Sequence, residues 1–179
     1  IDAIADLGQL DNTMIIYIMG DNGASAEGTM QGTSNEVAEA ANGVEETIPY
    51  LVSMMDELGG PTTYNHYPVG WAHAMNTPFQ WTKQVASHFG GTRNPLVVHW
   101  PKGIQEKGGM RFQSSHLIDV APPYLEAAGI PEPIQVHGVT QSPYEGTSMF
   151  YSFNDGKAPE QHDLQYFEMF CNRGIYHKG

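Results

Sequence analysis

Cysteine, basic residues and long apolar stretches are all scarce in this chain of 179 residues. Cys171 is the sole cysteine, so no disulfide can form within the chain and its stability does not depend on an oxidising compartment. No apolar stretch approaches the roughly 20 residues of a membrane span. The segment from Ile1 to Leu10 contains Asp2 and Asp6, where a signal peptide would carry basic residues. We therefore expect no membrane partner.

The few basic residues leave the chain strongly acidic. Lys and Arg number 8 against 20 Asp and Glu, which gives a formal charge of −12. Such a field repels a phosphate backbone, so we expect no nucleic-acid partner. The carboxylates suit a cation site, although acidic surfaces also serve solubility. Hydrophobic residues make up 40% of the chain, with 20 Gly and 12 Pro, which is typical of an α/β or α+β protein with ordered loops.

The run Thr13–Met19 is continuously apolar and is bounded on both sides by turn residues. This pattern predicts a strand buried on both faces, which is typical of a parallel sheet covered by helices. In such sheets ligands bind beyond the carboxyl ends of the strands. Asp21 and Asn22 follow the run at that position.

Periodicity and breaker residues divide the remaining chain into alternating helices and strands, as in doubly wound sheets. The predicted helices are one ending near Leu7, one from Thr33 that is interrupted at Gly43 and resumes to Leu58, a short one over Phe79–Phe89, and one over Ser115–Ala128. The other predicted elements are a loop over Thr62–Pro78, a strand over Pro95–Pro101, and a hairpin over Gln165–His177. There is no internal repeat.

Asp21 and Asn22 offer a carboxylate and an amide oxygen side by side. Both are hard donors that suit Ca²⁺ or Mg²⁺, and the neutral amide limits the charge on an ion that also receives an anion. The same residues are common in ordinary turns, so the pair alone leaves both interpretations open. An EF-hand is excluded, because the alternating ligands and the distal glutamate of that loop are missing.

The segment Asp21-Asn22-Gly23-Ala24-Ser25-Ala26-Glu27-Gly28 resembles the second metal-ligand segment of bacterial-type arylsulfatases in the sulfatase family. The segment Thr77–Asn94 is similar to the family segment that carries an active-site lysine, which corresponds to Lys83 here. Three further segments follow in the family's order: Trp100–Ile104, Leu117–Pro122 and Leu125–Pro131.

This resemblance implies an alkaline-phosphatase-like α/β fold, with a largely parallel sheet between helices. Residues 1–150 would be the C-terminal part of the catalytic domain, and residues 151–179 the start of a small antiparallel C-terminal subdomain. In the family a formylglycine attacks sulfur while a divalent ion holds the sulfate oxygens. The resemblance implies calcium, with magnesium second, bound by Asp21 and Asn22, and it implies that Lys83 contacts the sulfate.

The chain also departs from the family pattern. The nucleophile motif, Cys or Ser followed by x-Pro-x-Arg, does not occur, and Cys171 lies in an unrelated context. The family's first acidic metal ligands and its Lys-x-His segment are missing as well. We therefore expect a C-terminal fragment, with the missing N-terminal half of the same protein as one candidate partner. Alone it should bind calcium weakly or not at all, since calcium takes six to eight oxygens, and it should be inactive.

Several histidines and one arginine have alternative interpretations. His66 and His73 precede Lys83 in an aromatic segment; His73 is a candidate for substrate binding with Lys83, while packing or surface roles are the alternative for both. For His88 we do not favour a metal or acid–base role. His116 is predicted to be a structural hydrogen-bonding residue, and Arg93 to support the fold.

The resulting hypothesis is an arylsulfatase: a hydrolase that acts on a small-molecule sulfate monoester. One alternative is a phosphonate or phosphate monoester hydrolase of the same superfamily. Another is a non-catalytic subunit of a split gene. The compartment is left open between bacterial cytoplasm and periplasm.

Overall fold

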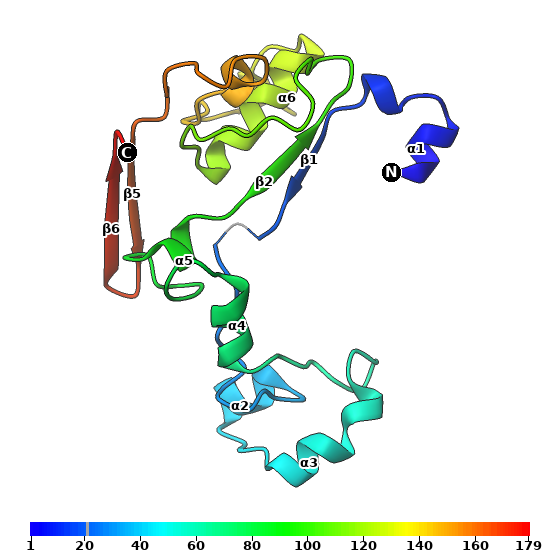
Figure 1. Cartoon of the computed structure of the whole chain (residues 1–179), viewed down its shortest axis with the longest axis vertical. Coiled ribbons are helices and arrows are strands. Elements are labelled where there is room, and N and C mark those ends of the chain that lie inside the picture. The colour runs from blue at the N-terminus through cyan, green and yellow to red at the C-terminus, as the bar shows by residue number, and fades with distance from the viewer. Residues whose placement is uncertain (21) are drawn as a thin grey trace. The chain divides into compact units, whose positions relative to one another are not determined.

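The computed structural model describes residues 1–20 and 22–179, which divide into two compact units (Figure 1). The first unit comprises Ile1–Ile18, Leu96–Tyr166 and Ile175–Gly179, and the second comprises Met19–Pro95 and Phe167–Gly174. The fold is mixed α/β with small two-stranded sheets. Within the described part of the chain, no helix has the length and apolar character needed to cross a membrane.

The first predicted strand forms, but its pairing corrects the expected sheet. β1 (Ile15–Ile18) pairs with β2 (Leu96–His99) in antiparallel orientation, with Ile16 opposite Val98 and Ile18 opposite Leu96 (Figure 1). The prediction of a parallel sheet is therefore wrong for these strands. An apolar run fits either orientation, and here only one face is covered: Tyr17 and its partner Val97 are 62% and 54% exposed.

Further elements complete the first unit. The predicted helix over Ser115–Ala128 forms in two pieces, a 3-10 turn at Leu117–Val120 and α6 (Ala121–Ala128), which ends as expected at Gly129 with φ of 65°. The remaining elements are α1 (Asp2–Asp6), 3-10 turns at Leu10–Asn12 and Met149–Ser152, and the short pair β3 (Gln135–Val136) and β4 (Val139–Thr140).

Asp119 is the buried anchor of this unit and is fully shielded from solvent. Its carboxylate accepts hydrogen bonds from the backbone N–H of His116 at 2.6 Å and of Thr147 at 2.7 Å. His162 Nδ1 also lies 2.7 Å from Asp119 Oδ2. The His116 side chain accepts a hydrogen bond from the Ile118 N–H, which confirms its structural role. A buried carboxylate needs hydrogen-bond partners, and those of Asp119 hold the backbone just before α6 in place.

The second unit contains α2 (Glu36–Asn42), α3 (Ile48–Ser53), a 3-10 turn at Met55–Glu57, α4 (Val69–Met75) and α5 (Phe89–Thr92). The helix predicted from Thr33 begins at Glu36, because the Asn35 side chain accepts a hydrogen bond from the Ala38 N–H at 3.1 Å and caps it. Gly43 ends α2 with φ of 63°, as the sequence predicted.

Two predictions between Thr62 and Phe89 are wrong. The segment predicted as a loop contains α4, and the predicted helix over Phe79–Phe89 does not form before its last residue, Phe89, where α5 begins. Trp81 and Gln84 have φ of 69° and 74°, which a right-handed helix excludes. Asn76 stabilises the turns instead: its side chain donates to the Trp81 carbonyl at 2.9 Å and accepts from the Ala24 N–H at 3.0 Å.

The predicted hairpin near the end of the chain is confirmed. β5 (Leu164–Met169) and β6 (Asn172–His177) form a two-stranded sheet joined by Phe170 and Cys171. Both connecting residues have positive φ, 47° and 68°, as the favoured two-residue hairpin turn requires. Cys171 is a free, exposed thiol in this turn.

Candidate functional site

The segment that follows β1 lies against the segment that carries Lys83. The Lys83 N–H donates to the Ala24 carbonyl at 3.0 Å. Gly23 has φ of 87°, and a Cβ built on it would lie 2.1 Å from the Gly90 carbonyl oxygen, so this approach requires glycine. Asn22, the candidate metal ligand directly before Gly23, is exposed. Asp21, the other candidate ligand, lies outside the described residues.

Lys83 and His73, the two candidate substrate-binding residues, line the same cleft of about 550 Å³ in the second unit. His73 comes from α4, and Lys83 from the turns that follow it. The aromatic side chains of Trp81 and Phe170 also line the cleft. The cleft therefore combines a cation, an imidazole and exposed aromatic surface. The substrate-binding role of the two residues stays a prediction.

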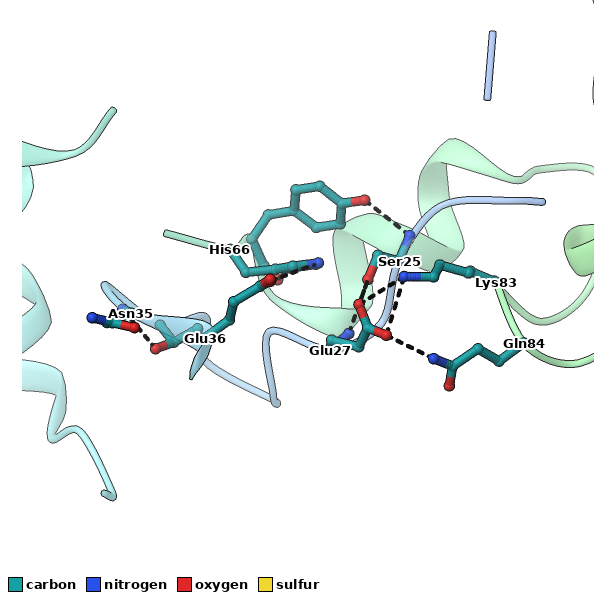
Figure 2. Close-up of polar contacts among 9 residues, drawn as sticks. Ser25, Glu27, Asn35, Glu36, His66, Lys83 and Gln84 are labelled. Carbon is teal, nitrogen blue, oxygen red and sulfur yellow. Dashed lines mark hydrogen bonds and ion pairs between the residues drawn. The ribbon is translucent and has the colours of Figure 1, made fainter. Parts of the chain in front are cut away.

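The Lys83 ammonium is held by a carboxylate that sequence reasoning did not single out. Its Nζ lies 2.9 Å and 3.1 Å from the two oxygens of Glu27 (Figure 2). Glu27 also accepts hydrogen bonds from the Ser25 hydroxyl at 2.6 Å and from the Gln84 amide at 2.7 Å. The bond from Ser25, followed by that from Lys83, lowers the pKa of the Glu27 carboxyl from its ordinary value. No spacing rule marked Glu27, because its partners lie 56 and 57 residues away.

Glu27 also belongs to a group that could hold a metal ion. Glu27, Glu36 and His66 each offer one ligand atom, and these atoms lie within 4.8 Å of one another. The His66 side chain is 9% exposed, so its packed position agrees with the structural alternative for this residue and leaves its Nε2 facing Glu36 at 3.9 Å (Figure 2). Sequence reasoning did not connect His66 to either glutamate.

A buried carboxylate holds the segment that carries Glu36. Glu46 is 6% exposed and accepts hydrogen bonds from the Thr33 hydroxyl at 2.7 Å, from the Ser34 N–H at 2.6 Å, and from the Ser34 hydroxyl. Burial alone would raise the pKa of Glu46, but the bonds from Ser34 and Thr33 outweigh it and hold the pKa below its ordinary value. Thr33 pairs in turn with His66 through an isolated antiparallel bridge.

Arg93 has the structural role that the sequence predicted. Its guanidinium lies 5.4 Å from the centre of the Phe79 ring and 5.5 Å from that of Phe89. Cations within about 6 Å of a ring centre are attracted to the aromatic face. Nearby, His88 Nδ1 lies 2.9 Å from the Ser87 hydroxyl, and its ring lies 5.9 Å from that of Trp81.

Comparison with sequence models of protein families places most of the chain in one family. Residues 1–130 match the sequence model of the family described as Sulfatase, which is well over half of the chain. A search of curated protein sequences finds no match to the chain.

Proposed function

The chain belongs to the sulfatase family, and we propose on this basis that it is part of a hydrolase that cleaves sulfate monoesters into an alcohol or phenol and inorganic sulfate. The family match over residues 1–130 carries the proposal. The cleft in the second unit supports it, because Lys83 supplies a cation there for an anionic group.

Lys83 would bind the sulfate. A fixed ammonium in a cleft stabilises negative charge that develops on the transferring group and on the departing oxygen, because water there screens it less than in bulk. Glu27 holds the ammonium at 2.9 Å in the absence of substrate, and both side chains are partly exposed, at 30% and 39%. An exchange of Glu27 for a sulfate oxygen would therefore cost little, since partly exposed ion pairs are weak.

Calcium would be the associated ion, with Asn22 as one ligand and Asp21 as a second. The donor set fits, because an amide and a carboxylate oxygen are hard donors. The bonds of Ala24 to Lys83 and Asn76, together with the close approach of Gly23 to Gly90, hold the backbone that follows Asn22 in one place. A bound divalent ion would supply Lewis-acid polarisation of the sulfate oxygens.

The preference for an aryl ester rests on the aromatic lining of the cleft. Trp81 is 54% exposed and Phe170 is 73% exposed, and both line the cleft beside Lys83. Large exposed aromatic side chains suit an aromatic leaving group, since rings pack favourably in offset or edge-to-face arrangements. His73 would contribute a hydrogen bond to the same substrate.

The nucleophile would come from outside these 179 residues, because the sequence contains no Cys/Ser-x-Pro-x-Arg motif. Exposed apolar side chains support packing against further protein. Tyr17 and Val97 lie opposite each other on the uncovered face of the β1–β2 pair and are 62% and 54% exposed. Such apolar surface is typical of an interface with a partner, here the N-terminal half that carries the nucleophile.

The test uses the intact protein that contains this chain, assayed with nitrophenyl sulfate and, in parallel, with nitrophenyl phosphate and a phosphonate monoester. The proposal expects sulfate release that dominates over the other two substrates and that is lost on calcium chelation. A dominant phosphate or phosphonate activity would favour the related hydrolases of the superfamily. Absence of all three activities with calcium present would favour a non-catalytic subunit.

A further inference from the structure

The group of Glu27, Glu36 and His66 brings together three segments of the second unit. Glu27 lies in the turn after β1, Glu36 is the first residue of α2, and His66 lies in the segment bridged to Thr33. One ligand atom from each lies within 4.8 Å of the others. Figure 2 shows His66 directed toward Glu36, and the Glu27 carboxylate near Lys83. The group differs from the proposed calcium ligands in both its residues and its donor chemistry.

The His66 ring is oriented as in a metal-binding histidine. Its Nδ1 lies 2.9 Å from the Tyr67 carbonyl oxygen. A carbonyl oxygen only accepts, so Nδ1 carries a proton, and Nε2 is the ring nitrogen that could donate its lone pair to an ion. A hydrogen bond from the second ring nitrogen to a carbonyl is the usual support of a metal-binding imidazole.

The backbone around His66 keeps this orientation. Thr33 and His66 exchange two backbone hydrogen bonds, at 3.0 Å and 2.9 Å. Gly28 packs so closely that a Cβ built on it would lie 2.0 Å from the Tyr67 carbonyl oxygen and 2.5 Å from His66 Nδ1. The His66 side chain is 9% exposed, so it is held mostly within the protein. An imidazole nitrogen within 4.8 Å of oxygens from two carboxylates provides three donors that a single ion could share.

The donor set selects the class of ion. One imidazole nitrogen and two carboxylate oxygens suit borderline divalent ions such as Zn²⁺, Co²⁺ or Mn²⁺, whereas Ca²⁺ prefers oxygen alone. Nε2 of His66 and Oε2 of Glu36 are 3.9 Å apart, which exceeds a hydrogen bond and lies just under the largest separation, about 4 Å, that two ligand bonds of about 2.0 Å can span. Small rotations of the two glutamate side chains would bring all three ligand atoms within bonding distance of one ion.

Lys83 is the competing cation for this group. It takes both oxygens of Glu27, which also accept from Ser25 and Gln84, so every acceptor position of that carboxylate is occupied. An ion that binds Glu27 must displace the ammonium. We propose that Glu27, Glu36 and His66 form a site for a divalent transition-metal ion of the zinc class, which competes with Lys83 for Glu27. The proposal does not depend on the proposed hydrolase activity.

The test is titration of the full chain with Zn²⁺ by calorimetry, and with Co²⁺ by visible absorption, at neutral pH. We expect one ion per chain, and a Co²⁺ ligand-field spectrum that Ca²⁺ does not abolish. Glu36→Gln and His66→Gln should each weaken binding at least tenfold. Lys83→Gln should strengthen it several-fold, because the competing cation is removed. Glu39→Gln, one turn further along α2, is the matched control and should bind as the wild type does.

Loss of a ligand should weaken metal binding, whereas loss of the Lys83 ammonium should strengthen it, so a general loss of folding cannot produce both results. Circular dichroism shows whether each variant folds; if His66→Gln does not, Glu36→Gln and the Co²⁺ spectrum of the wild type still decide. Absence of saturable binding overturns the proposal, as does binding that Glu36→Gln leaves unchanged. Equal affinity in Lys83→Gln and the wild type overturns the competition for Glu27.

Discussion

Glu46 provides the sharpest test of how the second unit holds its polar residues in place. Its buried carboxylate accepts from the Thr33 hydroxyl and from both the N–H and the hydroxyl of Ser34, residues that are themselves 3% exposed. The perturbation is a pair of substitutions, Glu46→Gln and Glu46→Ala. The first preserves shape but removes charge, and the second removes every bond to the side chain.

The expected magnitudes follow from these three bonds. Hydrogen bonds to a charged group contribute about 1.5–3 kcal/mol each, and neutral ones about 0.5–1.5 kcal/mol. In Glu46→Gln the amide oxygen can keep the Ser34 N–H, and the Ser34 hydroxyl can accept from the amide nitrogen, so we expect a loss of about 2 kcal/mol in the free energy of unfolding. Glu46→Ala also leaves the buried Ser34 N–H unpaired, which raises the loss to about 4 kcal/mol.

The assay is urea denaturation followed by tryptophan fluorescence, with hydrogen exchange measured at the Thr33 and His66 amides. These two amides should lose protection in both variants, because Glu46 fixes Thr33 and Thr33 pairs with His66. Glu45→Gln, at the exposed neighbouring position, is the control and should change the unfolding free energy by less than about 0.5 kcal/mol. If Glu46→Ala unfolds at the same urea concentration as Glu45→Gln, the reasoning is refuted.

Three further predictions concern Asp119, Arg93 and the pH dependence of stability. Asp119→Asn should lower the unfolding free energy by about 3 kcal/mol, because the carboxamide cannot accept from both backbone N–H groups that now bond the two carboxylate oxygens. An effect as small as that of Asp11→Asn, at an exposed position, would contradict this. Arg93→Ala should cost about 1–2 kcal/mol through the loss of two ring contacts, measured by thermal unfolding, and an unchanged melting temperature would exclude that role. The pKa values of Glu27 and Glu46 are lowered in the folded chain, so the stability they contribute is complete above their ordinary value of 4.5 and is lost as pH falls through the folded values. The stability difference between wild type and Glu46→Gln should therefore shrink from pH 7 to pH 3, and a constant difference would argue against the lowered pKa of Glu46.

Local signals in the sequence predicted much of the secondary structure. Gly43 and Gly129 end helices at the expected residues, and the alternating pattern from Gln165 to His177 forms the hairpin. These features depend on contacts between near neighbours, which composition and spacing record. The errors arise where distant residues decide. Asn76 and Gly90 contact the chain between Phe79 and Phe89 and hold it in turns with positive φ, against its helical period.

The candidate site was predictable only where a local sequence segment marked it. Lys83 was selected from a segment with a family resemblance, and His73 from the aromatic segment that precedes it; both line one cleft. Glu27 was quoted within a motif without a role, although it is the residue that binds the Lys83 ammonium. Thr33 and Ser34, which precede Glu36, contact Glu46 and His66 through pairing across 12 to 33 residues. No sequence period marks such pairing, and the antiparallel partnership of β1 and β2 was hidden for the same reason.

The central claim is that Lys83 binds the sulfate group of the substrate in its cleft. The turnover of Lys83→Ala tests this claim most directly. The intact protein is assayed with nitrophenyl sulfate beside Lys107→Ala, a control at an exposed lysine. The loss of one charge-stabilising group predicts turnover reduced about 100-fold or more, while the loss of its partly exposed ion pair with Glu27 should lower stability by less than about 1 kcal/mol. Equal turnover in the two variants would contradict the account.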